Sequence, residues 1–375
     1  MKIRWMFFFG LAQWAGMSLC LGSVADALKT VRAVGPEGQG NAAATTAWKE
    51  LATADAAALP ELLAGMDGAN SLAQNWLRTA VETLVARSTR EGQAPVAALT
   101  AVLEDTQHDA PTRVLAYEML KQFAPDQATA HYPALSQDPV AMLRVDAVAD
   151  LIRQADEKKN AAATDAAKTL YQQALDAARD KDQIDELAKK LADLGVEVDL
   201  PKQFGFLMNW HLIAPFTNVE RSGFDTVFPP EEKIDLSASY PGKGQEAKWV
   251  QFTSQDDYGM IDFNKPFDML KEVTGYAYTE FDAAEARDAE IRLGCKNAWK
   301  VWLNGQLLFA RDEYHRGMQL DQYILPCHLQ KGANTLLVKC CQNEQTEQWT
   351  VEWQFQLRIC DATGTAIAEA PAAAR

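Results

Sequence analysis

The stretch "NAWKVWLNGQLLFARDEYHRG" (residues 297–317) places an Asn-Gly pair, Asn304-Gly305, between two strongly apolar segments. A tight two-residue turn needs positive φ at both central positions, and Asn-Gly tolerates this well, so the pair predicts a β-hairpin. Folding the strands back on this turn pairs residue 303 with 306, 302 with 307, 301 with 308 and 300 with 309. This hairpin identifies the region around it as a β domain.

Side-chain alternation makes both faces of this hairpin apolar. The first face carries Trp299, Val301, Leu303 and Leu308, and the second carries Trp302, Leu307 and Phe309. We expect the first face in a core. The second must be covered by a loop of the same domain, by another domain or by a sugar. Since Lys300 is its only polar neighbour, we expect a protein cover, and a loss of ~3 kcal/mol or more on Trp302→Ala.

The rest of the chain after Pro201 also alternates with period two. The clearest strand is "WTVEWQFQLRI" (residues 349–359), with large apolar residues at every second position from Trp349 to Ile359. Further apolar segments, "MNWHLIAPF", "AEIRLGC" and "NTLLVKCC", are separated by Gly, Pro and Asn. Many short strands with regular turns predict an antiparallel β-sandwich or jelly roll over residues 201–361. Residues 362–375 have little to pack and predict a disordered tail.

The N-terminus has the layout of a secretory signal peptide, which we assign to residues 1–25. Lys2 and Arg4 precede an uncharged run, and small residues follow at the expected cleavage positions, after Ala25 or Ala27. The run is also long enough to remain as a membrane anchor if it is not cleaved. We therefore expect a secreted or periplasmic protein, in contact with a membrane only if this segment is retained.

Residues 26–200 show helical spacing of apolar residues. Three segments resemble one another: "SLAQNWLRTAVETLVA" (71–86), "DAPTRVLAYEMLKQF" (109–123) and "DPVAMLRVDAVADLI" (138–152). They align on a small residue four positions before a leucine, at Ala80/Leu84, Ala116/Leu120 and Ala147/Leu151. The spacing lies in the range of two-helix solenoid repeats. The pattern resembles degenerate HEAT-type repeats, which implies an α-solenoid of stacked helix pairs; a generic helical bundle is the alternative. Asp138-Pro139 predicts a helix start.

The C-terminal half resembles the jelly-roll modules appended to exported glycosidases and to protective-antigen-type carbohydrate-binding proteins. The resemblance rests on "IRLGCKNAWKVWLNGQLLF", "LQKGANTLLVKCCQNE" and "WTVEWQFQLRICDATG". The combination with helical repeats is similar to exported multidomain proteins of planctomycetes. Relatives that bind sugar often carry an acidic pair just before the hairpin. Here this position reads Cys295-Lys296-Asn297-Ala298, so calcium-dependent binding is not implied.

Six residues are candidates for ligand contact. The loop "RDEYHRG" gathers polar and aromatic side chains that could face a ligand, although a solvated, salt-bridged loop is the alternative. Asn297 offers one amide beside the hairpin, and "SQDDYG" could contribute a carboxylate from another loop. The candidates are Asp257, Asn297, Arg311, Asp312, Tyr314 and His315.

The chain shows no catalytic motif, and we expect no cofactor and no metal. No histidine stands in an HExxH spacing and no serine in a GxSxG turn. The formal net charge of −15 makes nucleic acid a poor partner. Three hypotheses follow: a non-catalytic exported scaffold that binds a protein partner or a cell-surface glycan, a dedicated carbohydrate-binding module, and a cryptic hydrolase. We favour the first.

The cysteines left after cleavage are all in the β region: Cys295, Cys327, Cys340, Cys341 and Cys360. Export permits disulfides, but an odd number leaves at least one thiol free or paired between chains. If their strands are adjacent, Cys341 and Cys360 are the candidate outer pair, and Cys340 is expected to be buried near Cys295. A metal cluster of Cys327-His328 with Cys340-Cys341 has no supporting CxxC spacing.

Overall fold

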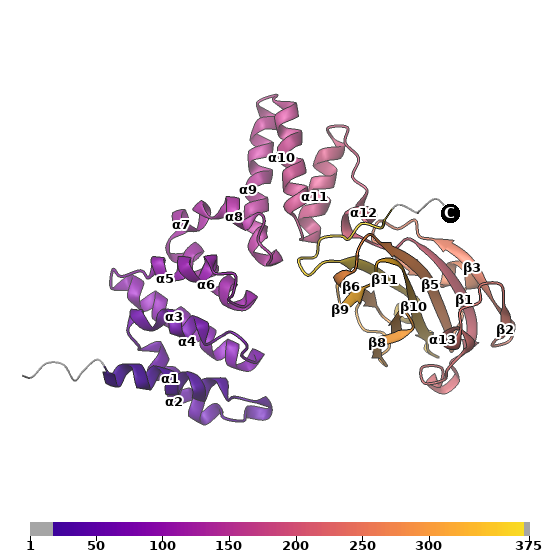
Figure 1. The fold of residues 1–375 in the computed structure, drawn as a ribbon, viewed down its shortest axis with the longest axis horizontal. Coiled ribbons are helices and arrows are strands. Elements are labelled where there is room, and N and C mark those ends of the chain that lie inside the picture. Colours follow the sequence, from indigo (N-terminus) through magenta and orange to yellow (C-terminus); the bar gives the residue numbers. More distant parts are fainter. Residues whose placement is uncertain (1–17, 371–375) are drawn as a thin grey trace, which may run out of the picture. The chain divides into compact units, whose positions relative to one another are not determined.

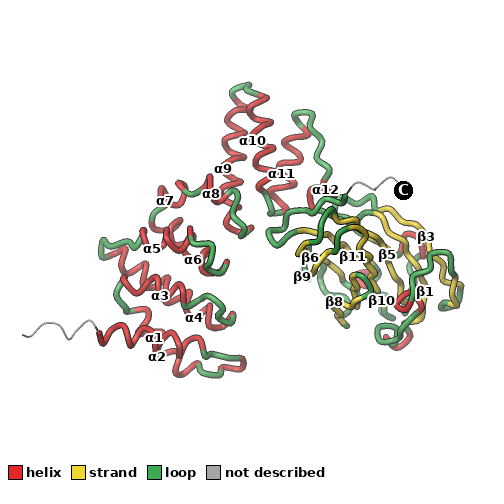
Figure 2. Tube along the Cα trace, viewed as in Figure 1, coloured by secondary structure: helices red, strands yellow, loops and turns green. Residues whose placement is uncertain are grey.

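The computed structural model describes residues 18–370, with side chains from residue 24 onward. The chain divides into two compact units, residues 1–180 and 181–375 (Figure 1). Helices dominate the first unit and antiparallel sheets the second, as the change of sequence period predicts (Figure 2). Among the described helices, none is long and apolar enough to cross a membrane.

The helical unit packs its helices pairwise in chain order, and successive pairs lie one above another in Figure 1. The helices are α1 (Ser18–Arg32), α2 (Asn41–Ala52), α3 (Leu59–Ala64), α4 (Ser71–Arg90), α5 (Val96–Glu104), α6 (Ala110–Phe123), α7 (Pro125–Ala130), α8 (Tyr132–Leu135), α9 (Ala141–Asn160) and α10 (Thr164–Ala177). The three similar segments fall on α4, α6 and α9. Their shared pattern is therefore a shared helix face.

The aligned small residues and leucines face the core of the unit, with one exception. Ala80, Leu84, Ala116 and Leu120 are each 0 % exposed and Ala147 is 1 % exposed. Leu151, which aligns with the two buried leucines, is only half buried. Before α9 the chain forms two short helices, α7 and α8, broken at His131. The third segment therefore keeps the pattern of a small residue four positions before a leucine, but the short helices before it do not fully cover that leucine.

Buried arginines link consecutive segments. Arg113 donates to the Leu103 carbonyl (2.9 and 2.8 Å) and to both carboxylate oxygens of Asp138 (2.9 and 2.5 Å). Arg144 donates to the Asp138 and Ala177 carbonyls. The helix start expected at Asp138 is therefore wrong. Its carboxylate binds Arg113 and the Val140 amide, and α9 begins at Ala141.

Helix α1 passes through both expected cleavage positions. Val24 and Ala27 are buried at 5 % and 3 % exposure in the core of the helical unit. Residues 1–17, which hold most of the expected signal peptide, lie outside the described residues.

The second unit begins with α11 (Lys181–Ala192), which was expected in the first domain, and continues with α12 (Leu200–Phe204) at the expected boundary. Tyr258 donates to both carboxylate oxygens of Asp185 (2.7 and 2.8 Å), and Lys181 lies 4.2 Å from the centroid of the Tyr258 ring. These contacts join α11 to the β region. The compact units therefore meet between Asp180 and Lys181 rather than between residues 200 and 201.

The β region contains one seven-stranded and one four-stranded antiparallel sheet. The strand orders are β2-β3-β1-β5-β10-β7-β8 and β4-β11-β6-β9. The bounds are β1 (Asn209–Thr217), β2 (Ser239–Pro241), β3 (Glu246–Thr253), β4 (Ile261–Asp262), β5 (Val273–Ala283), β6 (Arg287–Cys295), β7 (Ala298–Leu303), β8 (Gln306–Arg311), β9 (Tyr323–Leu329), β10 (Gly332–Gln342) and β11 (Gln354–Cys360), with short helices α13 (Pro229–Glu232) and α14 (Asn264–Phe267). One hydrophobic core takes residues from both sheets, among them Trp299, Trp353 and Phe355.

The hairpin forms at the predicted turn, where Asn304 and Gly305 have φ of 52° and 78°. Leu303 pairs with Gln306 and Trp302 with Leu307, as predicted. A register shift then pairs Val301 with Phe309 instead of Leu308. The expected pairs of residue 301 with 308 and 300 with 309 are therefore wrong. The extra residue turns the Phe309 ring to the core side, 5.4 Å from the Trp299 ring.

A segment of the same unit covers part of the second face of this sheet, whereas Leu307, which was expected to be covered, is 48 % exposed. Residues 224–234 lie over it, and Trp302 is half buried against a cluster that includes Phe228 and Ile234. Lys339, which the alternation along β10 places on this outer face, is 0 % exposed. Its ammonium donates to the carbonyls of Phe224 (3.0 Å) and Thr226 (2.8 Å) and to Glu231 (2.9 Å). All three ammonium hydrogens are thus satisfied.

The outer face of the four-stranded sheet is covered by two turns. Arg358 donates to both oxygens of Asp321 (2.7 and 2.6 Å) and to the carbonyls of Phe204 and Gly364. The Ala370 amide donates to the Asp282 carbonyl (2.7 Å). Residues 362–370 therefore make ordered contacts, unlike the expected disordered tail, and residues 371–375 lie outside the described part.

Candidate ligand-binding end of the β unit

Four loops meet at one end of the seven-stranded sheet. The strand registers place Thr217 opposite Val273, Val273 opposite Gln342, and Ala298 opposite Cys341. Arg311 at the end of β8 pairs with Trp299 beside them, and the loops at these strand ends span residues 218–223, 263–272, 312–317 and 343–353. Backbone bonds tie them together: the Asn218 amide donates to the Glu272 carbonyl, and the Glu272 amide donates to the Asn343 carbonyl. We call this surface the loop end.

Trp349 stands on the loop end with 60 % of its surface exposed. The expected strand from residue 349 is wrong, because β11 begins at Gln354 and residues 348–350 form a short 3-10 helix. Side-chain amides occupy the backbone groups that a longer strand would use. Asn297 accepts from the Gln354 amide and donates to the Glu352 carbonyl, and Gln342 donates to the Thr350 carbonyl.

The loop that carries Trp349 is held from both sides. Thr350 is fully buried, and its hydroxyl donates to the carbonyls of Gln345 (3.0 Å) and Glu347 (2.7 Å). The Lys271 ammonium donates to the Thr350 carbonyl (2.9 Å). The exposed indole therefore projects from a backbone whose position is fixed.

Two predicted ligand residues, Tyr314 and His315, lie beside this loop. His315 Nε2 is 2.7 Å from Asn343 Oδ1, and its ring meets the Trp349 ring edge-to-face at 5.4 Å. The Tyr314 hydroxyl accepts from Asn218 Nδ2 (3.1 Å), and burial raises the pKa of Tyr314. Both side chains are half buried. Each therefore supports the neighbouring loop and still leaves part of its ring accessible to a ligand.

The charged residues around Trp349 are mostly paired. Arg221 forms a bidentate pair with Glu344 (2.6 and 3.2 Å), which lowers the pKa of Glu344. Arg311 and Arg316 both bind Glu313 (2.7 and 2.6 Å). The two arginines of "RDEYHRG" therefore form salt bridges, as the alternative interpretation of this loop predicts.

Asp312 and Lys271 differ from these paired groups. Asp312 is exposed, and its charge acts on Arg221 and Tyr314. Lys271 forms no ion pair within the described residues, and its ammonium holds the Thr350 carbonyl. Burial lowers the pKa of Lys271, while the charge of Glu347 opposes that shift.

The other two predicted ligand residues do not join this surface as ligands. Asn297 is 1 % exposed, so it supports the Trp349 loop and cannot contact a ligand. Asp257 is exposed but follows β3, whose last residue Thr253 pairs with Asn209 at the start of β1. Since Thr217 at the other end of β1 borders the loop end, Asp257 lies at the opposite end of the sheet.

The candidate disulfide between Cys341 and Cys360 is not formed. The two residues lie in β10 and β11, which belong to different sheets, and the five described cysteines have free thiols. The expected neighbour of Cys340 is confirmed, since its Sγ lies 3.9 Å from Cys295 Sγ. Among the residues from 18 to 370, no three His, Cys, Asp or Glu side chains gather as a metal site.

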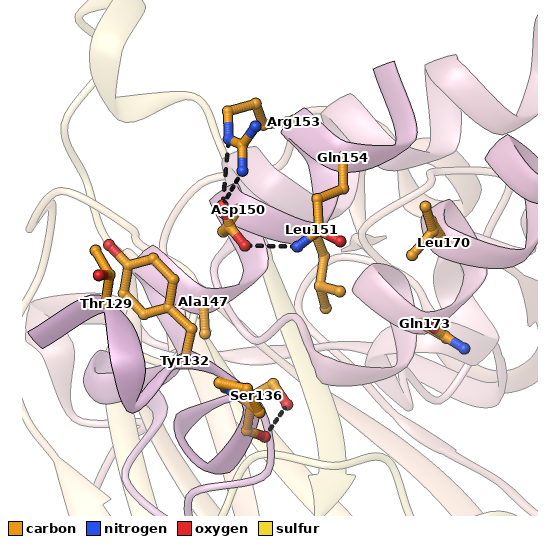
Figure 3. A pocket seen from close by; sticks show the side chains of 11 residues that line it. Thr129, Tyr132, Ser136, Ala147, Asp150, Leu151, Arg153, Gln154, Leu170 and Gln173 are labelled. Carbon is orange, nitrogen blue, oxygen red and sulfur yellow. Dashed lines mark hydrogen bonds and ion pairs between the residues drawn. The ribbon is translucent and has the colours of Figure 1, made fainter. Parts of the chain in front are cut away.

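The helical unit contains a pocket of about 810 Å³ between α7, α8, α9 and α10 (Figure 3). It lies where the third helical segment lacks a complete cover, so Leu151 and Leu170 form part of its wall beside Tyr132. Asp150 at its edge accepts from Arg153 (2.6 Å) and Gln154 (2.6 Å). The pocket thus has an apolar wall, and the carboxylate at its edge is already paired. Such a lining is better suited to binding a side chain of another molecule than to catalysis.

Neither the exposure of Trp349 nor the pocket was predicted from the sequence. The signal for Trp349 was the run "QNEQTEQ" before it, in which amides and carboxylates replace the alternation of a strand. The signal for the pocket was the pair of prolines, Pro125 and Pro133, which stand at the starts of the two short helices α7 and α8.

No family model matches the chain, and no curated protein sequence matches it. Among solved structures, the chain is similar to the GH31 alpha-xylosidase from Xanthomonas citri, with 8% identity, a TM-score of 0.21, and coverage of 30% of this chain and 15% of that one. It is also similar to the Beta-glucosidase from Kluyveromyces marxianus, with 10% identity, a TM-score of 0.25, and coverage of 75% and 35%. The chain thus spans about a third or less of these enzymes, and the TM-scores are too low to support an argument from either likeness.

Proposed function

We propose that this chain is a non-catalytic exported binding protein whose β unit binds a glycan through the loop end and whose helical unit contacts a protein. In this proposal the helical unit is a short α-solenoid of HEAT-like pairs and the β unit is a jelly-roll sandwich. The observation that carries the proposal is the exposed, firmly held indole of Trp349 beside hydrogen-bonding groups.

A sugar ring needs an apolar surface for its C–H face and polar groups for its hydroxyls. Trp349 offers the first over 60 % of its area. The exposed polar residues Glu344, Glu347 and Gln348 stand on the same loop and offer the second. Because the loop is already fixed by Thr350 and Gln342, a ligand loses little affinity in ordering it.

The hydrolase alternative is weaker because most titratable groups of the loop end are engaged, and the exposed Asp312 has no second carboxylate or histidine bonded to it among the described residues. His315 is bonded to Asn343, and Glu344 and Glu313 are bonded to arginines. A general base needs a free lone pair within reach of a substrate proton. The negative net charge also argues against nucleic acid as the ligand.

The pocket supports the protein-binding part of the proposal. Its wall of Leu151, Leu170 and Tyr132 offers an apolar surface to side chains of a partner. Docking of such an anchor into a pocket is a common mode of recognition.

Affinity electrophoresis against a panel of neutral and acidic polysaccharides tests the glycan proposal. We expect at least one polysaccharide to retard the wild-type protein and Trp349→Ala to raise the Kd by about 30-fold, equivalent to ~2 kcal/mol. Leu307→Ala is the matched control, since Leu307 is also an exposed apolar residue, at 48 %, but lies beside the hairpin turn. Retardation by no polysaccharide, or equal binding of wild type and Trp349→Ala, would remove the proposal.

A further inference from the structure

Two buried thiols face each other where the two sheets of the β unit converge. Cys295 Sγ lies 3.9 Å from Cys340 Sγ, and the residues are 2 % and 0 % exposed. Cys295 ends β6 in the four-stranded sheet, and Cys340 lies in β10 of the seven-stranded sheet. We propose that Cys295 and Cys340 are an oxidation site, which forms a disulfide between the two sheets when the chain folds in an oxidising environment.

The chain path explains why the sheets are close enough at this point. Only Lys296 and Asn297 separate β6 from β7, so the backbone passes from one sheet to the other within two residues. On the far side of that crossing, Trp299 of β7 pairs with Cys340. A disulfide needs Cα atoms within about 7 Å and an S–S bond of about 2 Å. The sulfurs therefore have about 2 Å to close, which side-chain rotation can supply.

The other thiols have different surroundings, which makes the pairing selective. Cys341 points to the opposite face of β10, where its sulfur accepts from the Thr274 hydroxyl (3.5 Å). Cys360 Sγ is directed to the Glu290 carbonyl (4.0 Å). Cys327 lies on the edge strand β9. Within the described residues, the only sulfur-to-sulfur contact is that between Cys295 and Cys340.

The bond forms by thiol–disulfide exchange with a small disulfide such as oxidised glutathione. One cysteine thiolate attacks the glutathione disulfide and releases one glutathione thiolate. The second cysteine thiolate then attacks the protein sulfur of this mixed disulfide and releases the other glutathione. Two protein thiols are oxidised and one disulfide is reduced to two thiols. Complete burial raises the pKa of Cys340 and excludes the oxidant, so exchange takes place before the two sheets close.

The cross-link would fix the corner that supports the loop end. Cys295 also donates to the carbonyls of Asn297 and Gln354 (both 3.5 Å). Asn297 in turn holds the Gln354 amide behind Trp349. A covalent tie at residue 295 therefore restrains the same backbone that positions the exposed indole.

Peptide mapping of the oxidised protein tests the inference. The reduced chain is refolded with a mixture of reduced and oxidised glutathione, unfolded in the presence of iodoacetamide, and digested without reduction. We expect one cross-linked peptide pair that joins residues 295 and 340, with residues 327, 341 and 360 alkylated. Reduction of the folded, oxidised protein should lower its Tm by about 5 °C or more.

Cys341→Ala is the matched control, since it removes a buried thiol beside the site and should keep the cross-link. Cys340→Ala should leave Cys295 alkylated. Wild-type protein that refolds to a cooperative thermal transition with residues 295 and 340 both alkylated would overturn the inference. A cross-link between any other pair would also overturn it. Since the mapping uses the wild-type chain, a variant that fails to fold does not affect the result.

Discussion

The covered outer face of the seven-stranded sheet and its loop end each carry a tryptophan, but the two side chains differ in exposure. Trp302 on the outer face is half buried against the segment of residues 224–234, whereas Trp349 on the loop end is 60 % exposed. Trp302 stands in an apolar-rich stretch, whereas Trp349 follows the polar run "QNEQTEQ". The difference comes from partners that are distant along the chain, so an aromatic residue in a strand pattern does not by itself reveal a binding surface.

The two regions are also held by different interactions. A buried ion pair, Lys339 with Glu231, fastens the cover, and a second one, Arg358 with Asp321, fastens the turns on the other sheet. The loop end is held by neutral amides, chiefly those of Asn297 and Gln342. Ion pairs therefore hold the segments that cover the two sheets, whereas side-chain amides chiefly hold the exposed loop end.

Removal of the buried cation should have the largest effect on stability. Lys339→Met leaves Glu231, whose side chain is 10 % exposed, without its cation and leaves two carbonyls without a donor. We expect a loss of ~3 kcal/mol or more in the free energy of unfolding, measured by urea denaturation. Lys300→Met is the control: Lys300 is half buried over the Phe224 ring at 4.4 Å and should cost below about 1 kcal/mol. Equal costs would mean that the cover does not depend on this ion pair.

The second covered face should lose stability in acid. Burial alone would raise the pKa of Asp321, but Arg358 and Arg292 reverse this and hold that pKa below its ordinary value. The stabilisation is therefore complete above the unfolded pKa of about 3.9 and disappears as the pH falls toward the folded pKa. We expect Asp321→Asn to cost ~2–3 kcal/mol at pH 7 and to flatten the decline in stability below about pH 4. Parallel pH profiles for the wild type and the variant would contradict this assignment.

Truncation of the covered tryptophan should have a smaller effect. Since Trp302 is only half buried, we expect Trp302→Ala to cost ~2 kcal/mol, below the ~3 kcal/mol predicted for a fully buried ring. Glycan binding should not change. Trp349→Ala should show the opposite result, with unchanged unfolding and weakened binding. Loss of binding in Trp302→Ala with intact stability would move the ligand site to the sheet face.

The features that the sequence predicts correctly depend on neighbours in the chain. The Asn304-Gly305 turn follows from local φ preferences, and the buried positions of Ala80, Leu84, Ala116 and Leu120 follow from helical spacing. The change from helices to strands near residue 205 follows from the change of period.

The features that it misses depend on distant side chains. Lys339 finds Glu231, 108 positions earlier, and Asn297 binds the backbone 55 and 57 positions later. Asp138 meets Arg113 and so does not cap its helix. The loop end was predicted only in part for the same reason. Tyr314 and His315 were found because they cluster locally, whereas Trp349 joins them only in the folded chain.

The smallest effect is expected from Asp257→Asn, which tests whether the ligand site lies at one end of the sheet only. Asp257 is exposed on the loop after β3, at the end opposite Trp349. Its neighbour Asp256 shapes that loop by accepting from the Tyr258 amide (2.9 Å). Asp257→Asn removes one surface charge and should change the free energy of unfolding by less than about 0.5 kcal/mol. The glycan Kd, measured by the same affinity electrophoresis, should equal that of the wild type. A higher Kd for the variant would show that a carboxylate at the far end takes part in binding. The ligand site would then have to include both ends of the sheet.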